Sequence, residues 1–332
     1  MGTRALRLTS VVILLAACGA LFLLSARTGA EAFVPEAGQE MLPTLLEGCR
    51  NAVSSVKSGK GRVTIYERYE REDERILETE TSYNLWFSGE RFRLSVSERI
   101  LQCTFESALP PDQRRLSPGR VLRREVAYDG EKVTTLEVNE GTATVGEYKF
   151  QDHGVQDYMS VQFAPSHVLC EVEKVGELPG YTIGELRIVG REPVNGDECL
   201  VIELTRKPSE GRKTGGLFTY WLWVSPGKGF TVPRTRCWVE GGVTYKEKTL
   251  ISQDDAEEVR QYGDVWGPAK VTLVEHRING ETGEYYKNGE ETITYSPDFQ
   301  VNVPLTGEEL SLVLPPGTKV YNKLLDEWSV VP

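Results

Sequence analysis

Residues 217–251 read LFTYWLWVSPGKGFTVPRTRCWVEGGVTYKEKTLI. Aromatic and β-branched residues fill three runs of this stretch, and proline or glycine stands between the runs, which is how strands and turns are usually marked in a sequence. The first break is Ser225–Gly229 and the second is Gly241-Gly242. The stretch therefore predicts three antiparallel strands joined by two tight turns.

The neighbouring sequence continues the same pattern. Apolar and polar residues alternate over residues 62–69, which predicts a strand with one buried and one solvated face. Dipeptides that favour two-residue hairpin turns occur at Asp129-Gly130, Asn195-Gly196, Asn279-Gly280 and Asn288-Gly289. The predicted fold class is therefore mainly β, a large curved antiparallel sheet with one long helix and some short ones.

The long helix is expected near the start of the chain, over residues 40–57. Its apolar residues have helical spacing, and Pro43 fits the first turn, where no backbone N–H is needed. Residues 58–61, Ser-Gly-Lys-Gly, are expected to end the helix. The apolar stripe that would cover the sheet consists of Leu42, Leu45, Leu46, Cys49, Val53 and Val56.

The first 32 residues have the pattern of an export segment. Arg4 and Arg7 precede an apolar run over residues 8–24, and Ala30-Glu31-Ala32 follows as a cleavage site for a signal peptidase. We therefore predict a signal peptide or membrane anchor over residues 1–32 and a single domain over residues 33–332, located in the periplasm or cell envelope.

Two other readings of the same segment remain open. Residues 15–19, Leu-Ala-Ala-Cys-Gly, match a bacterial lipobox, in which Cys18 would be lipidated. The apolar run is also just long enough to span a bilayer as an uncleaved anchor. Each reading places the body of the protein outside the cytoplasm and associates it with a membrane through the N-terminus.

Composition and motifs argue against several function classes. The net charge of −11 argues against a nucleic-acid partner, because no basic surplus is present to replace phosphate counterions. Cysteines are widely spaced and no C-x-x-C occurs, which argues against a zinc or thioredoxin-like centre. His153, His167 and His276 are far apart in sequence, and the acidic run 254–258 is typical of a solvated turn. We therefore predict no metal, no cofactor and no enzymatic activity.

Several short motifs resemble one family. Residues 86–93, WFSGERFR, look like an early hairpin of the periplasmic lipoprotein-carrier superfamily, which includes LolA, LolB, LppX and RseB. Residues 128–132, YDGEK, resemble its next turn. Residues 223–234 resemble its W-x-D-P-x-x-G-x-P-x-R hairpin, with Ser225 where aspartate is usual. The resemblance implies an unclosed β-barrel whose concave apolar face, covered by helices, holds acyl chains.

Strand residues 217–224 suggest where such a ligand would lie. Both faces of this strand are apolar, so one face either packs in a core or lines a cavity. Because the family that the motifs resemble holds acyl chains on its concave face, we predict a lipid groove lined by Phe92, Leu94, Trp221 and Trp223. The predicted ligand is a lipid or an acylated lipoprotein. The alternative is an envelope sensor or scaffold that binds a protein partner with the same half-barrel.

Overall fold

The computed structural model describes residues 36–71, 75–104, 117–147, 181–209, 215–241, 245–279 and 282–332. The export segment with Cys18 lies outside these ranges, as do a short helix expected near residues 165–174, Cys170, His153 and His167. In the described residues, none of the helices has the length and apolarity that crossing a bilayer requires.

The structure confirms the mainly β fold class, because its strands form one large unclosed sheet of 16 strands with an N-terminal helix. Strands adjacent in sequence pair antiparallel from β1 to β6 and from β7 to β12, and β6 pairs in parallel with β15. The helical elements are η1 (Glu36–Met41), α2 (Leu42–Ser54) and η3 (Pro226–Lys228). The strands are β1 (Ser58–Glu70), β2 (Ile76–Ser88), β3 (Arg91–Cys103), β4 (Val121–Tyr128), β5 (Lys132–Glu137), β6 (Thr142–Glu147), β7 (Tyr181–Val194), β8 (Asp197–Pro208), β9 (Leu217–Ser225), β10 (Thr231–Gly241), β11 (Tyr245–Tyr262), β12 (Val265–Ile278), β13 (Tyr285–Tyr295), β14 (Gln300–Val301), β15 (Lys319–Asn322) and β16 (Glu327–Val330).

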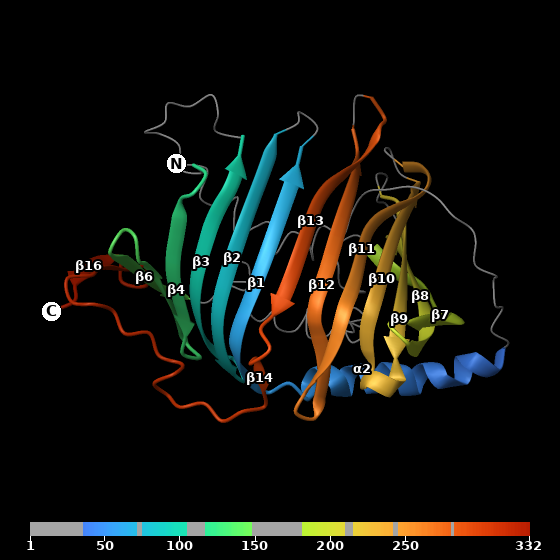
Figure 1. Cartoon of the computed structure of the whole chain (residues 1–332), viewed down its shortest axis with the longest axis horizontal. Helices are drawn as coiled ribbons and strands as arrows, with labels where there is room; N and C mark the ends of the chain where they lie inside the picture. The colour runs from blue at the N-terminus through green and yellow to red at the C-terminus, as the bar shows by residue number, and fades with distance from the viewer. Residues whose placement is uncertain are drawn as a thin grey trace. The chain divides into compact units, whose positions relative to one another are not determined.

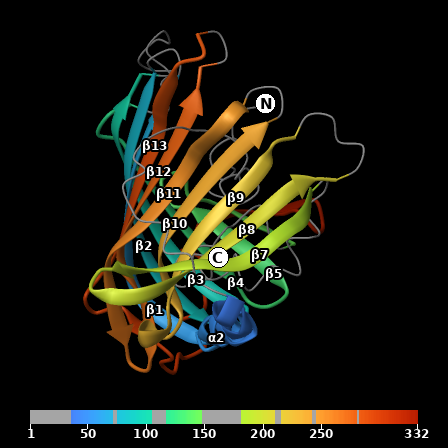
Figure 2. The same cartoon turned by 90° about the vertical axis from the view of Figure 1, so that its right-hand side faces the viewer.

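The chain forms two compact units, which we call unit 1 and unit 2. In unit 1 the strand order is β16-β15-β6-β5-β4-β3-β2-β1, and β14 pairs with β1 (Figure 1). In unit 2, α2 accompanies strands in the order β12-β11-β10-β9-β8-β7 (Figure 2). Strand β13 contributes residues to both units. The prediction of a single domain over residues 33–332 stays a prediction.

The central meander forms as its sequence predicts. Strands β9 and β10 pair antiparallel across the turn, with Trp223 opposite Arg234 and Trp221 opposite Arg236. The turn contains η3, and the Ser225 hydroxyl accepts a hydrogen bond from the Lys228 N–H at 3.2 Å, as an N-cap does. The family resemblance expects aspartate at this cap, and serine performs the same role.

Three local predictions are wrong. The acidic run 254–258 lies within the long strand β11 instead of forming a turn, and Asn288-Gly289 lies within β13. Asn288 is buried, and its side-chain amide donates a hydrogen bond to the Glu275 carboxyl on the neighbouring strand instead of forming a turn. Residues 58–61 open β1, because the helix has already ended at Ser54. Residues that favour turns form one only where the segment after them can pair with the segment before them.

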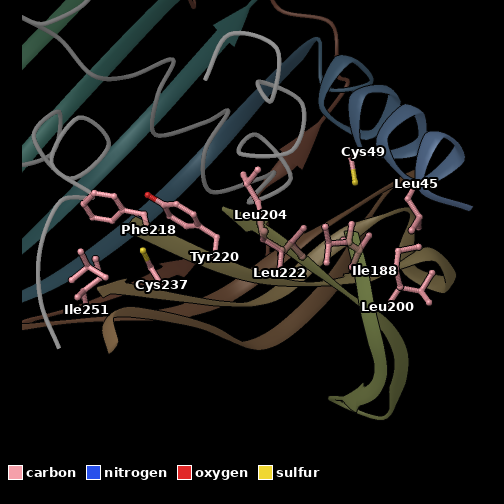
Figure 3. Packing of buried hydrophobic residues seen from close by; sticks show 14 of the residues in the cluster. Leu45, Cys49, Ile188, Leu200, Leu204, Phe218, Tyr220, Leu222, Cys237 and Ile251 are labelled. Carbon is pink, nitrogen blue, oxygen red and sulfur yellow. The ribbon is translucent and has the colours of Figure 1, made fainter. Parts of the chain in front are cut away.

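Helix α2 packs on unit 2 through the predicted stripe. Leu45 and Cys49 are buried against the sheet (Figure 3). Leu42 and Leu46 are partly buried and pack against the same cluster. The side chain of Val53 is not among the described residues, and Val56 follows the end of the helix. The burial of Leu45, with 2% of its surface exposed, makes it the main anchor of the stripe.

Gly48 is a contact point between α2 and the central hairpin. A Cβ added there would lie 2.5 Å from three ring atoms of Phe230, which itself has a left-handed backbone at φ 62°. We expect Gly48→Ala to destabilise the protein, because overpacking costs about 1–3 kcal/mol and outweighs the gain of about 1 kcal/mol in helix propensity. Urea unfolding measures the change. In a Phe230→Ala background the same substitution should become neutral or stabilising, and an unchanged penalty there would contradict the proposed contact.

Candidate functional site

One face of the unit 2 sheet is apolar and lies under α2, and we call it the helix-covered face. Leu45 and Cys49 lie above Ile188 and Leu200, while Phe218 lies at the far end of the same face (Figure 3). Cross-strand register shows which side chains share the face, since residues directly opposite point to the same side. Its buried members on the sheet are Ile188, Leu200, Ile202, Leu204, Phe218, Tyr220, Leu222, Val224, Val232, Cys237, Val239, Tyr245 and Ile251.

The helix-covered face becomes acidic on β11 and β12. Leu222 is opposite Thr235, and Thr235 is opposite Asp254, so Asp254 lies on this face. By the same reasoning through Cys237 and Ser252, Glu275 lies there too. Apolar strands β8 to β10 therefore continue into a patch that carries two carboxyl groups.

Both carboxyl groups of this patch are shifted by burial. Asp254 as a residue is partly exposed, but its carboxyl is enclosed by protein, and burial raises its pKa to about 7. The charge of Arg236 and a 3.3 Å hydrogen bond from the Ser252 hydroxyl oppose the shift. Burial also raises the pKa of Glu275, against the effects of Arg277 and of a hydrogen bond from Asn288. A protonated carboxyl is neutral and can donate a hydrogen bond inside an apolar surface.

The predicted tryptophans lie on the opposite face of β9. Trp221 and Trp223 alternate with Tyr220 and Leu222, so they point away from α2. The ring centroids of Trp221 and Trp223 are 6.1 Å apart, and Trp238 is 5.2 Å from Trp221. We call Trp221, Trp223 and Trp238 the tryptophan cluster.

The indole N–H groups of Trp221 and Trp223 both have hydrogen-bond acceptors. The Trp221 indole N–H donates to Glu203 and the Trp223 indole N–H donates to Glu192, each at 2.8 Å. Burial raises the pKa of Glu203, but hydrogen bonds from Trp221 and Arg187 outweigh it and leave the pKa below its ordinary value. The tryptophan cluster is thus built into a network of ion pairs and hydrogen bonds.

Cations also stack on the tryptophan cluster. The guanidinium of Arg234 lies 5.6 Å from the Trp223 ring and pairs with Asp255 at 2.8 Å. The ammonium of Lys248 lies 5.5 Å from the Trp238 ring. Such cation–π contacts stabilise a sheet surface by about 0.5–1 kcal/mol each at exposed sites.

The other two predicted residues belong to unit 1. Phe92 and Leu94 are buried on one face of β3, and Phe92 lies 5.8 Å from the Tyr128 ring. Polar residues share this face, because Val63 is opposite Tyr83, Tyr83 is opposite Val96, and Glu67 alternates in phase with Val63. Glu67 accepts a 3.1 Å hydrogen bond from Thr79. Burial raises the pKa of Glu67, and the charge of Glu98 adds to the shift.

The structure thus brings the predicted residues together in pairs, Trp221 with Trp223 and Phe92 with Leu94, each pair within its own unit. The lining role of these four residues stays a prediction. Sequence reasoning missed Asp254, since carboxylates in acidic runs are usually solvated, and it also missed Glu275, a single carboxylate within β12. Asp254 can be recognised once the strand register is known, because it is opposite Thr235 on β10, and Thr235 is opposite the buried Leu222 on β9.

Among the described cysteines, Cys49, Cys199 and Cys237 are buried, and burial raises the pKa of Cys199 to about 11. His276 stacks on Tyr285 with ring centroids 5.0 Å apart. Within the ranges that the structure describes, no three His, Cys, Asp or Glu side chains form a metal-binding group.

No protein-family model and no curated protein matches the chain. Among solved structures, a DUF1329 family protein from Desulfovibrio piger is 11% identical with a TM-score of 0.40, covering 81% of this chain and 97% of that one. A LolA superfamily protein from Nitrosomonas europaea is 12% identical with a TM-score of 0.36, covering 82% and 97%. The lipoprotein LppX from Mycobacterium tuberculosis is 10% identical with a TM-score of 0.25, covering 80% and 98%.

The Nitrosomonas europaea protein has the name of the superfamily that the sequence motifs resemble.

Proposed function

We propose that this chain is an exported, non-enzymatic protein that binds the acyl chains of a lipid or lipoprotein in the bacterial cell envelope. One observation carries the proposal. The helix-covered face continues from the residues under Leu45 and Cys49 to Phe218 and Ile251 at its far end (Figure 3). A long apolar strip on a sheet is the shape that an extended hydrocarbon chain fits.

The energetics of such binding are favourable without a charged anchor. An acyl chain with about fifteen methylenes would gain about 12 kcal/mol on burial, at about 0.8 kcal/mol for each methylene. Immobilising the ligand costs at least about 4 kcal/mol. The difference of at most about 8 kcal/mol corresponds to a dissociation constant of about 1 μM at the tightest.

The acidic patch sets the polarity along one side of the strip, because Asp254 is level with Leu222 and Glu275 is level with Tyr220. A protonated Asp254 can donate a hydrogen bond to an ester carbonyl, while the apolar residues take the hydrocarbon. A carboxylate at the same place would repel an anionic headgroup. We therefore expect binding to favour neutral headgroups and low pH.

The proposal is tested by charge insertion on the two faces of one strand. Leu186 and Val189 are both half-buried on β7, but Leu186 packs on the helix-covered face and Val189 packs beside the tryptophan cluster. We expect Leu186→Lys to weaken binding of a brominated fatty acid at least about tenfold, since burying a lysine charge in an apolar site is costly. Val189→Lys is the matched control and should bind as the wild type does.

Saturable tryptophan quenching and native mass spectrometry of co-purifying lipid measure the binding, and circular dichroism verifies the fold. If only Val189→Lys loses binding, the ligand lies on the tryptophan face, and the predicted lining by Trp221 and Trp223 gains support. If the folded wild-type protein shows neither saturable quenching nor a bound lipid, acyl-chain binding is wrong. The protein-binding hypothesis then takes its place.

A further inference from the structure

The β15–β16 hairpin of unit 1 displays large apolar side chains to solvent. Its turn is formed by residues 323–326, and both leucines of the turn, Leu324 and Leu325, are exposed, at 50% and 64% of their surface. Trp328 and Val330 on β16 are 66% and 60% exposed. Apolar side chains gathered in this way on a soluble surface mark an interaction site.

The hairpin holds these side chains in a fixed position. The Tyr321 and Trp328 rings stack across the two strands with centroids 5.1 Å apart, and the Tyr321 hydroxyl donates to Asp326. Strand β15 is anchored to β6 by parallel pairing over its whole length. The leucines are therefore presented at the tip of an ordered turn.

The turn also satisfies its own backbone groups. The Leu324 N–H donates to the Asn322 side chain at 2.9 Å, and the Leu325 N–H donates to the Asn322 carbonyl at 3.3 Å. The Lys323 N–H donates to the Val145 carbonyl at 2.8 Å. Because these three N–H groups already have acceptors within the protein, transferring the tip from water to lipid leaves none of the three unpaired. Entry into a lipid environment requires such pairing.

We propose that the β15–β16 hairpin docks on the surface of a phospholipid bilayer by inserting Leu324 and Leu325. A projecting tip requires a matching pocket on a protein partner, whereas a bilayer accepts it without one. Trp328 suits the interfacial region because its ring is apolar and its N–H is polar. Within the turn Lys323 can meet a lipid phosphate, while Asp326 and the exposed Glu327 beside it limit insertion to the interface. This docking is independent of acyl-chain binding on the helix-covered face.

The test uses the full chain and measures the depth of Trp328 rather than binding as such, since the N-terminal segment is itself expected to hold the protein at a membrane. Vesicles of phosphatidylethanolamine and phosphatidylglycerol carry bromine on their acyl chains. The difference in fluorescence between the wild type and Trp328→Phe isolates this one tryptophan. We expect its emission to be quenched by bromine and shifted to the blue when vesicles are present.

Two variants decide the role of the leucines. The double variant Leu324→Ser and Leu325→Ser should lose the bromine quenching of Trp328, while Val313→Ser, which removes another exposed apolar side chain, should retain it. The emission of the other tryptophans verifies that each variant is folded. If Trp328 stays unquenched by bromine and open to aqueous acrylamide, the docking is wrong. Sedimentation that shows a dimer lost in the double variant would instead assign the tip to a second copy of this chain, which also overturns the proposal.

Discussion

Leu45→Ala is expected to lower the free energy of unfolding by about 2–5 kcal/mol, the range for truncating a buried leucine. Leu45 is 2% exposed and belongs to the apolar cluster of the helix-covered face, so alanine would leave a cavity between α2 and the sheet. The helix packs through few other large side chains, and Leu42 and Leu46 are only half-buried. A shift of the urea midpoint at constant slope measures the loss.

The matched control is Glu47→Ala on the exposed side of the same helix. Glu47 is exposed and lies near Arg50, a pair that contributes little on a surface. We expect this substitution to change the free energy of unfolding by no more than about 0.5 kcal/mol. Equal effects of the two substitutions would show that α2 does not contribute to the core, and the helix-covered face would then lack its cover.

The sequence predicted the hairpins of the central meander well because their signals are local. Ser225, Pro226 and Gly229 define a turn by their own backbone preferences, and the aromatic runs beside them have strand propensity. Asn195-Gly196 likewise forms a turn with positive φ at both residues, as a two-residue hairpin of this kind requires. The helix start was also local, since Pro43 falls in its first turn.

Other features depend on partners distant in sequence and could not be predicted locally. Strand β6 pairs in parallel with β15, more than 170 residues later, and neither that pairing nor β16 has a strong local signal. The length of β11 follows from pairing with both β10 and β12. Because β11 continues through the acidic residues 254–258, the alternation of side chains along the strand places Asp254 on the helix-covered face.

The candidate site was predicted in part for the same reason. Alternation showed that Trp221 and Trp223 share one face of their strand, and the structure places both there. Which face the helix covers is a tertiary property, and α2 lies over Leu222 and Val224 instead. A residue pattern with period two defines two faces but does not say which of them a distant helix will cover.

Asp254→Asn is expected to stabilise the protein near pH 8 and to have little effect near pH 4. Burial raises the pKa of Asp254 from an ordinary 3.8 to about 7 in the folded protein. Between these two values the folded protein keeps a proton that the unfolded chain has released, so stability falls as pH rises through this window. Above about pH 7 the buried carboxylate is charged, and its full cost is present.

Asparagine removes this cost because it is neutral at every pH and has nearly the same shape. The expected gain near pH 8 is at most about 4 kcal/mol, from about 1.4 kcal/mol for each unit of pKa shift. The charge of Glu275 adds to the pKa shift of Asp254, so asparagine also removes the repulsion between these two carboxylates at high pH.

Urea unfolding of both proteins at several pH values measures the difference. Asp255→Asn is the control, since Asp255 pairs with Arg234 and Arg236 on the opposite face and its loss should not stabilise the protein at any pH. A difference between Asp254→Asn and the wild type that does not grow with pH would mean that Asp254 is ionised throughout. The neutral donor proposed for the acidic side of the lipid strip would then be absent, and binding would not depend on pH through this group.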